Sequence, residues 1–257
     1  MPEVRYSFSR ISQFSQCPRR FRYRYIDGVK EAFQSVEGFV GQRVHATIEW
    51  LYLERVAGRE PDSREAVTWY CDDWDRAILG AQTVRVVRGV DSLESHRRRG
   101  AELVDSYHRR RFVEDRLETV AVEHHFVVEL QNRYSFQGYI DRLARDSEGL
   151  FHVIDYKTGR RTPRSFAGKE ADQLHAYALA IFKENAVEEV ELVLEFLTST
   201  RSLRARVRRS QCEAVEEQLA SRIGAIESAT VFPPSPGVLC DWCGYNDICD
   251  AARTRFS

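Results

Sequence analysis

Two short stretches of the sequence combine acidic residues with a lysine in a spacing suited to phosphate chemistry: GYIDRL at 138–143 and VIDYKTG at 153–159. Side chains alternate along a strand, so Asp155 and Lys157 share one face of the second stretch. A predicted turn between the stretches makes them neighbouring strands, and Asp141 then converges on the same point. Carboxylates bind Mg²⁺ or Mn²⁺, which activate water, and an ammonium group stabilises a charged transition state. The pattern suits hydrolysis of phosphodiesters, although D-x-K alone is a weak signal that better fits an ordinary ion pair between Asp and Lys on an edge strand.

Four further polar residues could take part in such a site: His45, Gln173, Tyr177 and Glu123. His45 and Glu49 stand four residues apart in HATIE, so they share one face of a helix. Gln173 and Tyr177 have the same spacing in DQLHAYALA. Taken alone, each pair fits a partly buried helix face as well as a binding site. Glu123 in AVEHHF is a further acidic candidate, but its place in a strand favours a position that faces solvent.

Three cysteines near the C-terminus, Cys240, Cys243 and Cys249, follow the spacing C-x2-C-x5-C. Thiolates this close together bind zinc or an iron–sulfur cluster, and such sites use four ligands. The fourth ligand must come from the other cysteines of the chain: Cys17, Cys71 and Cys212. Cys71 and Cys212 lie in helical patterns, where ordinary packing is the usual role. Cys17 lies at a helix break before a proline, beside arginines that favour the thiolate, and is the expected fourth ligand.

The overall charge does not indicate a polyanionic partner, because the 257 residues carry a formal net charge of −1. Arginines nevertheless cluster in three segments: 18–25, 97–99 and 201–209. Each cluster alone fits a solvated helix or strand face. The first cluster interleaves arginine with Phe21, Tyr23 and Tyr25, and this mixture suits nucleic acid, since guanidinium pairs with phosphate while aromatic rings stack on bases.

The sequence shows no membrane or export segment. The N-terminus lacks the apolar region of a signal peptide, and the longest apolar stretch, HAYALAIF, is too short to span a bilayer. We therefore expect a cytoplasmic protein without membrane contact. In that reducing compartment the six cysteines favour metal binding or burial over disulfides.

The hydrophobic periodicity predicts a mixed α/β chain. Helical patterns run over 7–27, with a break at Pro18, and from 41 to about 114; strand patterns follow at 117–130, 134–146 and 150–159, then a helix at 170–186, strands at 187–200 and 202–210, and a helix at 210–228. The tail beyond 231 is Pro-rich and irregular. The expected fold is a central mixed β-sheet flanked by helices, with a helical N-terminal half and a C-terminal cysteine tail.

Taken in order, these segments resemble the RecB-like branch of the PD-(D/E)XK nuclease superfamily over most of the chain. YSFSRISQFSQCPRRFRYRYIDGV is similar to the opening segment of that branch, and GQRVHATIE to its helix with a metal-binding histidine. GYIDRL and DYKTG are similar to its catalytic strands, and DQLHAYALA to its helix with a glutamine and a tyrosine one turn apart. Asp155 stands where many members have glutamate, and Ile140 where others have proline; both variants occur in the superfamily.

The resemblance implies a restriction-endonuclease-like core and a set of site residues. The implied catalytic residues are Asp141, Asp155, Lys157, Gln173 and Tyr177. The implied site for Mg²⁺ or Mn²⁺ consists of His45, Asp141, Asp155 and Tyr156. In these roles Gln173 hydrogen-bonds near the lysine or the phosphate, and Tyr177 touches the DNA backbone.

A subset of this branch carries a 4Fe-4S cluster on one N-terminal and three C-terminal cysteines, which here implies the ligands Cys17, Cys240, Cys243 and Cys249. Such a cluster would clip the chain ends together around the nuclease core, and zinc is the alternative metal. The implied organisation is a single nuclease domain over 1–257, with a helical subdomain at 41–115, a catalytic sheet core at 116–210 and an iron–sulfur clasp at 17 and 240–249.

We therefore expect a metal-dependent DNA nuclease, an exonuclease on single-stranded or frayed DNA ends. Two other functions fit the same features. One is a DNA-binding scaffold that does not cleave, within a recombination or repair complex. The other is a nuclease that trims ends for CRISPR adaptation. DNA is the expected partner, as a single strand or as duplex ends, and a helicase or recombination protein is a further one.

Overall fold

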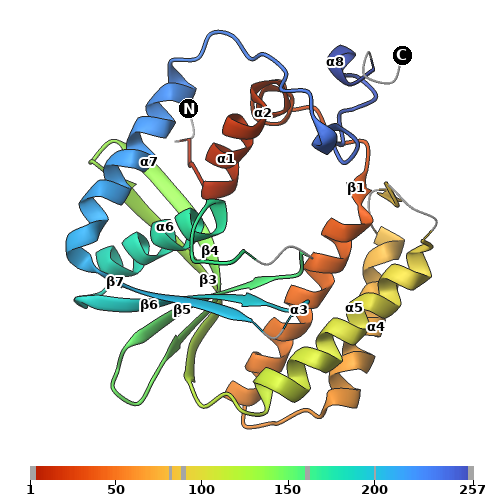
Figure 1. Cartoon of the computed structure of the whole chain (residues 1–257), viewed down its shortest axis with the longest axis vertical. Helices are drawn as coiled ribbons and strands as arrows, with labels where there is room; N and C mark the ends of the chain where they lie inside the picture. The colour runs from red at the N-terminus through yellow and green to blue at the C-terminus, as the bar shows by residue number, and fades with distance from the viewer. Residues whose placement is uncertain (1–3, 81–82, 88–90, 160–162, 200, 254–257) are drawn as a thin grey trace.

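The computed structural model describes residues 4–80, 83–87, 91–159, 163–199 and 201–253. A five-stranded sheet lies at its centre, in the order β3-β4-β5-β6-β7 (Figure 1). Neighbouring strands are antiparallel except β5 and β6, which are parallel and are connected through helix α6. The strands are β3 Glu118–Leu130, β4 Tyr134–Arg145, β5 Phe151–Lys157, β6 Glu189–Phe196 and β7 Ser202–Arg208; β1 Gln34–Ser35 and β2 Val84–Arg85 form a separate short parallel pair. Thr200, the predicted end of the β6 strand, lies outside the described residues.

Helices cover both faces of the sheet (Figure 1). The core on one face is built with α1, α6 and α7, and the core on the other face with α3, α4 and α5. The helices are α1 Phe8–Gln16, α2 Pro18–Tyr25, α3 Val36–Val56, α4 Ser63–Gly80, α5 Leu93–Tyr107, α6 Lys169–Glu184, α7 Cys212–Glu227 and α8 Asp250–Arg253; the short turns are η1 His108–Phe112, η2 Arg209–Gln211 and η3 Val238–Cys240. This arrangement confirms the predicted fold class. None of the described helices combines the length and the apolar character needed to cross a bilayer.

The predicted alternation along β5 is confirmed and assigns its residues to different cores. Val153 packs in the core that contains α6, whereas Ile154 and Tyr156 pack in the core that contains α3, α4 and α5. Asp155 and Lys157 therefore lie on the α6 side of the sheet.

Local sequence signals explain where the first elements begin and end. The side chain of Ser7 caps α1 by accepting a hydrogen bond from the backbone N–H of Arg10, at 3.2 Å. Pro18 occupies the first position of α2, where its missing N–H costs nothing, so the predicted break is confirmed. Between β3 and β4 the chain reverses through Gln131 and Asn132, which both adopt positive φ as a tight hairpin turn requires.

The C-terminal segment returns to the N-terminal helices. Figure 1 shows it beside α2, and two hydrogen bonds fix it there. The backbone N–H of Arg19 donates to the carbonyl of Pro233 at 3.2 Å, and the hydroxyl of Tyr245 donates to the carbonyl of Val29 at 3.0 Å. The segments 19–29 and 233–245 are thus held side by side.

Gly100 in the middle of α5 is required by close packing against α4. A Cβ atom at this position would lie 1.9 Å from the hydroxyl oxygen of Tyr70, which is fully buried. We predict that Gly100→Ala lowers the free energy of unfolding by about 1–3 kcal/mol, as overpacking does. Gly80→Ala is the matched control, because nothing lies within 4 Å of its Cβ position; it should be neutral or stabilise by up to about 1 kcal/mol. Urea denaturation measures both, and equal stability of the two variants would contradict the packing argument.

Candidate metal centre and cysteine site

Strands β4 and β5 bring the two aspartates together on the α6 side of the sheet. The pairing of Arg142 with Ile154 places Asp141 directly opposite Asp155. Asp155 is 3% exposed, and the ammonium of Lys157 lies 2.6 Å from its Oδ2 atom. Burial, followed by repulsion from Asp141, raises the pKa of Asp155. Because the two carboxylates are close together and Asp155 is buried, binding of a cation between them would be strongly favoured.

Helix α3 contributes His45 from the opposite layer. Its Nδ1 atom lies 3.4 Å from Asp141 Oδ2. The helix can approach this closely because Gly41 has no side chain: a Cβ atom there would lie 3.1 Å from Thr158 Oγ1. Burial by itself would lower the pKa of His45, but the carboxylates of Asp141 and Asp155 outweigh burial and raise it.

Glu123 also belongs to this cluster, so the prediction that it faces solvent is wrong. Ligand atoms of His45, Glu123 and Asp141 all lie within 4.8 Å of one another. Burial, with the nearby charges of Asp141 and Glu49, raises the pKa of Glu123 to about 7. The donor set consists of two carboxylates and one imidazole. Carboxylates suit both Mg²⁺ and Mn²⁺, and the imidazole suits Mn²⁺ better than Mg²⁺. The set therefore fits a divalent metal.

A strained backbone turns Glu123 towards the other ligands. Its φ angle is 46°, which is uncommon for a residue with a side chain. Val122 and His124 keep their partners on β4, while the contact face of β3 changes at Glu123: both Ala121, before it, and Phe126, after it, pack on the α6 side. The two residues are an odd number of positions apart, so regular alternation would put them on opposite faces. In the sequence, the only indication of this change of face is the unbroken run of polar residues from Glu123 to His125.

Tyr156, the remaining residue of the implied metal set, contacts the site through its backbone. Its N–H donates to Asp141 Oδ2 at 2.8 Å. Its ring lies on the opposite face of β5 and packs edge-on against the ring of His45, with 6.2 Å between the centroids. The backbone N–H of Tyr156 therefore orients Asp141 and its ring orients His45, and the side chain does not itself offer an oxygen to the metal.

Lys157, Gln173 and Tyr177 form a chain of hydrogen bonds. Lys157 donates to Gln173 Oε1 at 3.3 Å, and Gln173 Nε2 donates to the hydroxyl of Tyr177 at 2.6 Å. Tyr177 is only 7% exposed, and its ring packs against Phe126. The expectation that Tyr177 touches DNA thus does not match its burial; it orients Gln173. Gly138 makes room for this packing, because a Cβ atom there would lie 2.6 Å from Phe126 and 3.0 Å from Tyr177.

The arginine-aromatic segment in α2 packs against the chain instead of presenting its rings outward. Phe21 is 2% exposed in the core, so it cannot stack on a base. The ring of Tyr23 contacts that of Tyr245 at 5.4 Å between centroids, and Arg20 pairs with Glu31 at 2.8 Å. This segment therefore holds the C-terminal tail.

The four cysteines named as cluster ligands line one small cavity of about 30 Å³ between α2 and the tail: Cys17, Cys240, Cys243 and Cys249. Backbone N–H groups point at two of their sulfurs, from Ser235 to Cys17 at 3.5 Å and from Gly237 to Cys240 at 3.4 Å. Four thiols with such donors fit a thiolate-bound metal. Cys71 and Cys212 pack elsewhere, against the two separate cores.

A family model described as the PD-(D/E)XK nuclease superfamily matches residues 5–250, which include every residue of both sites. The chain belongs to the PD-(D/E)XK nuclease superfamily. Membership indicates a metal-dependent nuclease, and hence a hydrolase. No curated protein matches the chain. Among solved structures, the crystal structure of SSO0001 is similar with 17% sequence identity and a TM-score of 0.41, over 98% of this chain and 88% of that chain.

The place of Glu123 in the cluster predicts a loss of metal affinity on substitution. We expect Glu123→Gln to weaken Mn²⁺ binding at least about tenfold, because a charged ligand is lost while the shape is kept. Glu129→Gln is the matched control, since Glu129 is an exposed acid on the same strand. Isothermal titration calorimetry measures both, and wild-type affinity in Glu123→Gln would exclude Glu123 as a ligand.

Proposed function

We propose that this nuclease acts on DNA as an exonuclease on single-stranded or frayed ends, with Mg²⁺ or Mn²⁺ at the acidic cluster. The observation that carries the proposal is the meeting of His45, Glu123 and Asp141 beside the buried pair of Asp155 and Lys157. Separate elements supply a metal-ligand set and a fixed cation at one point of the sheet, as hydrolysis of a phosphodiester requires.

The residues around the cluster have distinct tasks in this proposal. A bound divalent metal supplies a water of lowered pKa and neutralises charge on the phosphate. His45, Glu123, Asp141 and Asp155 would hold it. Lys157 is fixed from two sides, by Asp155 and by Gln173, so its ammonium is preorganised to stabilise the charge that develops on the phosphate oxygens.

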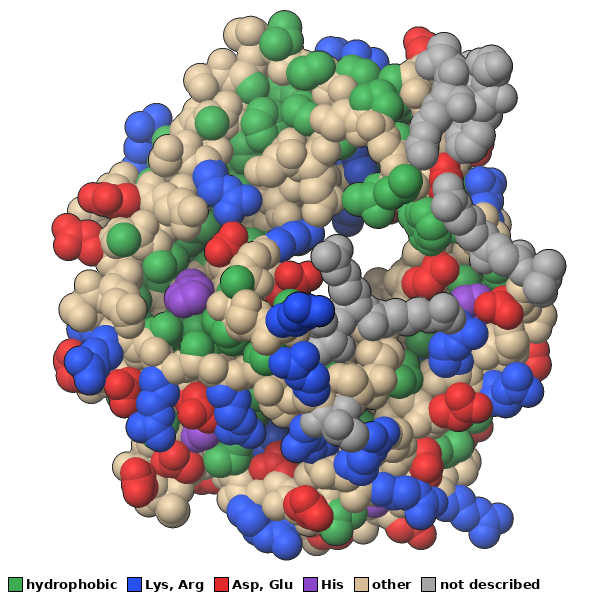
Figure 2. All heavy atoms as spheres, in the orientation of Figure 1, with side chains coloured by type: hydrophobic (Ala, Val, Ile, Leu, Met, Phe, Trp, Pro, Cys, Tyr) green, Lys and Arg blue, Asp and Glu red, His purple; other side chains and the backbone are tan. Residues whose placement is uncertain are grey.

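A large cavity next to the catalytic strand supports a single-stranded substrate. It encloses about 730 Å³ and is lined by Thr158 and Gly159, which directly follow Lys157, by α3 and α5, and by Trp242 from the tail. Figure 2 shows the molecule hollowed between the part that carries the tail and the part that carries the sheet. Arg99, which pairs with Asp91 at 3.4 Å in the same lining, and the ring of Trp242 are the two kinds of side chain that single strands contact, a cation for phosphate and an aromatic ring for a base.

We further propose that the four cysteines hold a 4Fe-4S cluster with a structural role. Three observations support it: the thiols share one cavity, they come from both ends of the chain, and all six cysteines are free thiols, as in a reducing cytoplasm. The cluster would close a loop that contains the whole sheet, and this long closure stabilises the fold against unfolding. On this proposal residues 1–257 form one nuclease domain.

Removal of Lys157 or Asp141 tests the catalytic proposal. We expect Lys157→Ala and Asp141→Asn to lower cleavage of an end-labelled single-stranded oligonucleotide by at least about a hundredfold, because each removes a charge that acts on the reacting phosphate. Lys183→Ala is the control, since Lys183 lies on the same α6 helix as Gln173 but pairs with Glu216 on α7. Cleavage by Lys157→Ala at the wild-type rate would contradict the proposal, and cutting of circular single strands would contradict an exonuclease.

Substitution of single cysteines tests the cluster. We expect Cys17→Ser to remove the bound iron and the broad visible absorption of anaerobically purified protein, and to lower its melting temperature. Cys71→Ser and Cys212→Ser should retain both, because these thiols lie outside the cavity. Colourless wild-type protein with stoichiometric zinc would show that the site holds zinc instead.

A further inference from the structure

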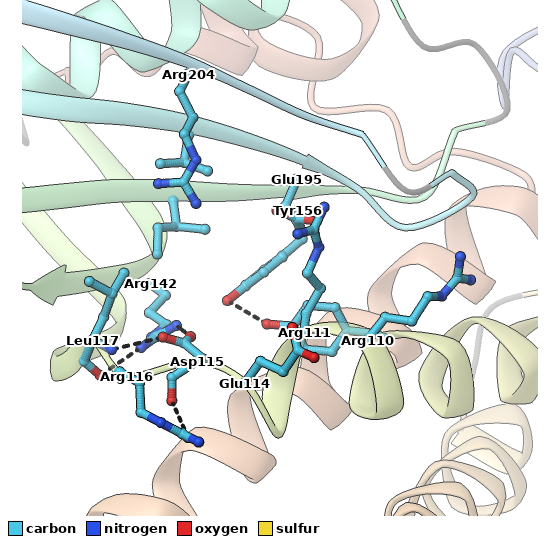
Figure 3. A pocket seen from close by; sticks show the side chains of 13 residues that line it. Arg110, Arg111, Glu114, Asp115, Arg116, Leu117, Arg142, Tyr156, Glu195 and Arg204 are labelled. Carbon is cyan, nitrogen blue, oxygen red and sulfur yellow. Dashed lines mark hydrogen bonds and ion pairs between the residues drawn. The ribbon is translucent and has the colours of Figure 1, made fainter.

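A second cavity lies on the other face of the catalytic sheet, beneath η1 and the segment that leads into β3. It encloses about 300 Å³, and a neighbouring cavity of about 290 Å³ shares Tyr107, Arg110 and Glu195 with it. Figure 3 shows Arg111, Arg142 and Arg204 directed into the space between η1 and the sheet, while the side chains of Arg110 and Arg116 extend outward from its edge. We call this cavity the arginine pocket, after Arg110, Arg111, Arg116, Arg142 and Arg204, which line it.

Carboxylates within the described residues compensate three of these five charges. Arg142 is 1% exposed and pairs with Asp115, Arg111 pairs with Glu195 at 2.8 Å, and Arg204 pairs with Glu191 at 2.7 Å.

The other two arginines are bound only by backbone carbonyls within the described part of the chain. Arg110 donates to Ser106 at 3.3 Å, and Arg116 donates to Val113 at 2.9 Å. One further acid, Glu114, lines the pocket. The rim therefore keeps an excess of positive charge, which suits an anion with several oxygen acceptors.

The floor of the pocket is apolar and aromatic. Ile154 and Val193 come from the central strands, and Tyr107 and Tyr156 contribute their rings. The hydroxyl of Tyr107 donates to that of Tyr156 at 3.2 Å, so the two rings are held in place. An apolar floor under a cationic rim matches a base joined to a phosphate, and the volume lies at the lower limit of small-molecule sites.

We propose that the arginine pocket binds a mononucleotide, with its phosphate at the arginine rim and its base against Tyr107, Tyr156 and Ile154. A strand of nucleic acid would need a long groove of arginines, whereas this cavity encloses about 300 Å³, the lower limit of a site for a single small molecule. The pocket lies on the opposite face of β5 from Asp155 and Lys157, so it is distinct from the place where cleavage is proposed.

Tyr156 connects the two sites. Its ring lines the arginine pocket, its backbone N–H donates to Asp141 Oδ2 at 2.8 Å, and its ring packs against His45. A nucleotide that presses on the ring acts on the position of a metal ligand through one residue. Tyr156 is thus a positioning residue, and this coupling rests on the proposed nuclease function, whereas binding to the pocket does not.

Calorimetric titration with deoxyadenosine monophosphate tests the binding, on the full-length protein as purified and without added divalent metal. We expect saturable binding that Arg204→Ala weakens about tenfold, as the loss of one charge-assisted contact does. Arg206→Ala is the matched control: both arginines are exposed on the same face of β7 and both contact Glu191, but only Arg204 lines the pocket. The control should bind within about twofold of wild type.

Four results would overturn the binding proposal. They are absence of binding, equal weakening by Arg204→Ala and Arg206→Ala, equally tight binding of inorganic phosphate, and binding of oligonucleotides through Arg204 without binding of the mononucleotide. For the coupling, added nucleotide should change the cleavage rate of wild type at least twofold and leave that of Arg204→Ala unchanged. Nucleotide binding without any change in the cleavage rate would overturn the proposed coupling between the two sites, but it would leave the proposed binding site standing.

Discussion

Repulsion between carboxylates is the constraint around which this protein is built. Oxygens of Glu123 and Asp141 lie within 4.8 Å of each other, and Asp155 is the direct neighbour of Asp141 on the next strand. Two unit charges at that distance repel by about 4 kcal/mol at an effective dielectric constant of about 20. This is a large part of the free energy by which a domain is stable. The fold offsets it with the N–H of Tyr156, the ammonium of Lys157 and the imidazole of His45, and a divalent cation would complete the compensation.

Two members of the cluster depend on a local backbone feature. Gly41 helps His45 to approach Asp141, because a Cβ atom at this position of α3 would lie 3.1 Å from Thr158 Oγ1. Glu123 turns inward through a left-handed backbone conformation, which costs about 1–3 kcal/mol. This local cost brings Glu123 into the candidate ligand set, and the surrounding ladder of β3 and β4 pairs holds the strained residue in place.

The sequence predicts the site residues whose positions follow from the regular alternation of side chains along a strand. It does not predict Glu123, where that alternation is broken. Asp141, Asp155 and Lys157 could be placed because strands of period two and a short turn fix their face and their register. Glu123 could not be placed, because the positive φ angle that redirects it is a departure from regular strand geometry that alternation does not predict. Burial also decides roles that spacing leaves open: one helical turn brings Gln173 and Tyr177 together, but only the packing of Phe126 against Tyr177 shows that the tyrosine lies behind the glutamine. The same limit applies to the C-terminal tail. The spacing of its cysteines indicates a ligand set, but contacts with α2 determine where that set lies in the fold.

The cysteine site and the catalytic strand are linked through the path proposed for the substrate. The described tail is irregular apart from η3 and the short α8, and its position relies on contacts such as that of Arg19 with Pro233. Trp242, between two of the cysteines, lines the same cavity as Thr158 and Gly159. A centre that binds Cys17 together with the tail would therefore fix one wall of that cavity relative to the residues that follow Lys157. A structural metal centre would then influence cleavage without taking part in the chemistry, because it determines where the strand can lie.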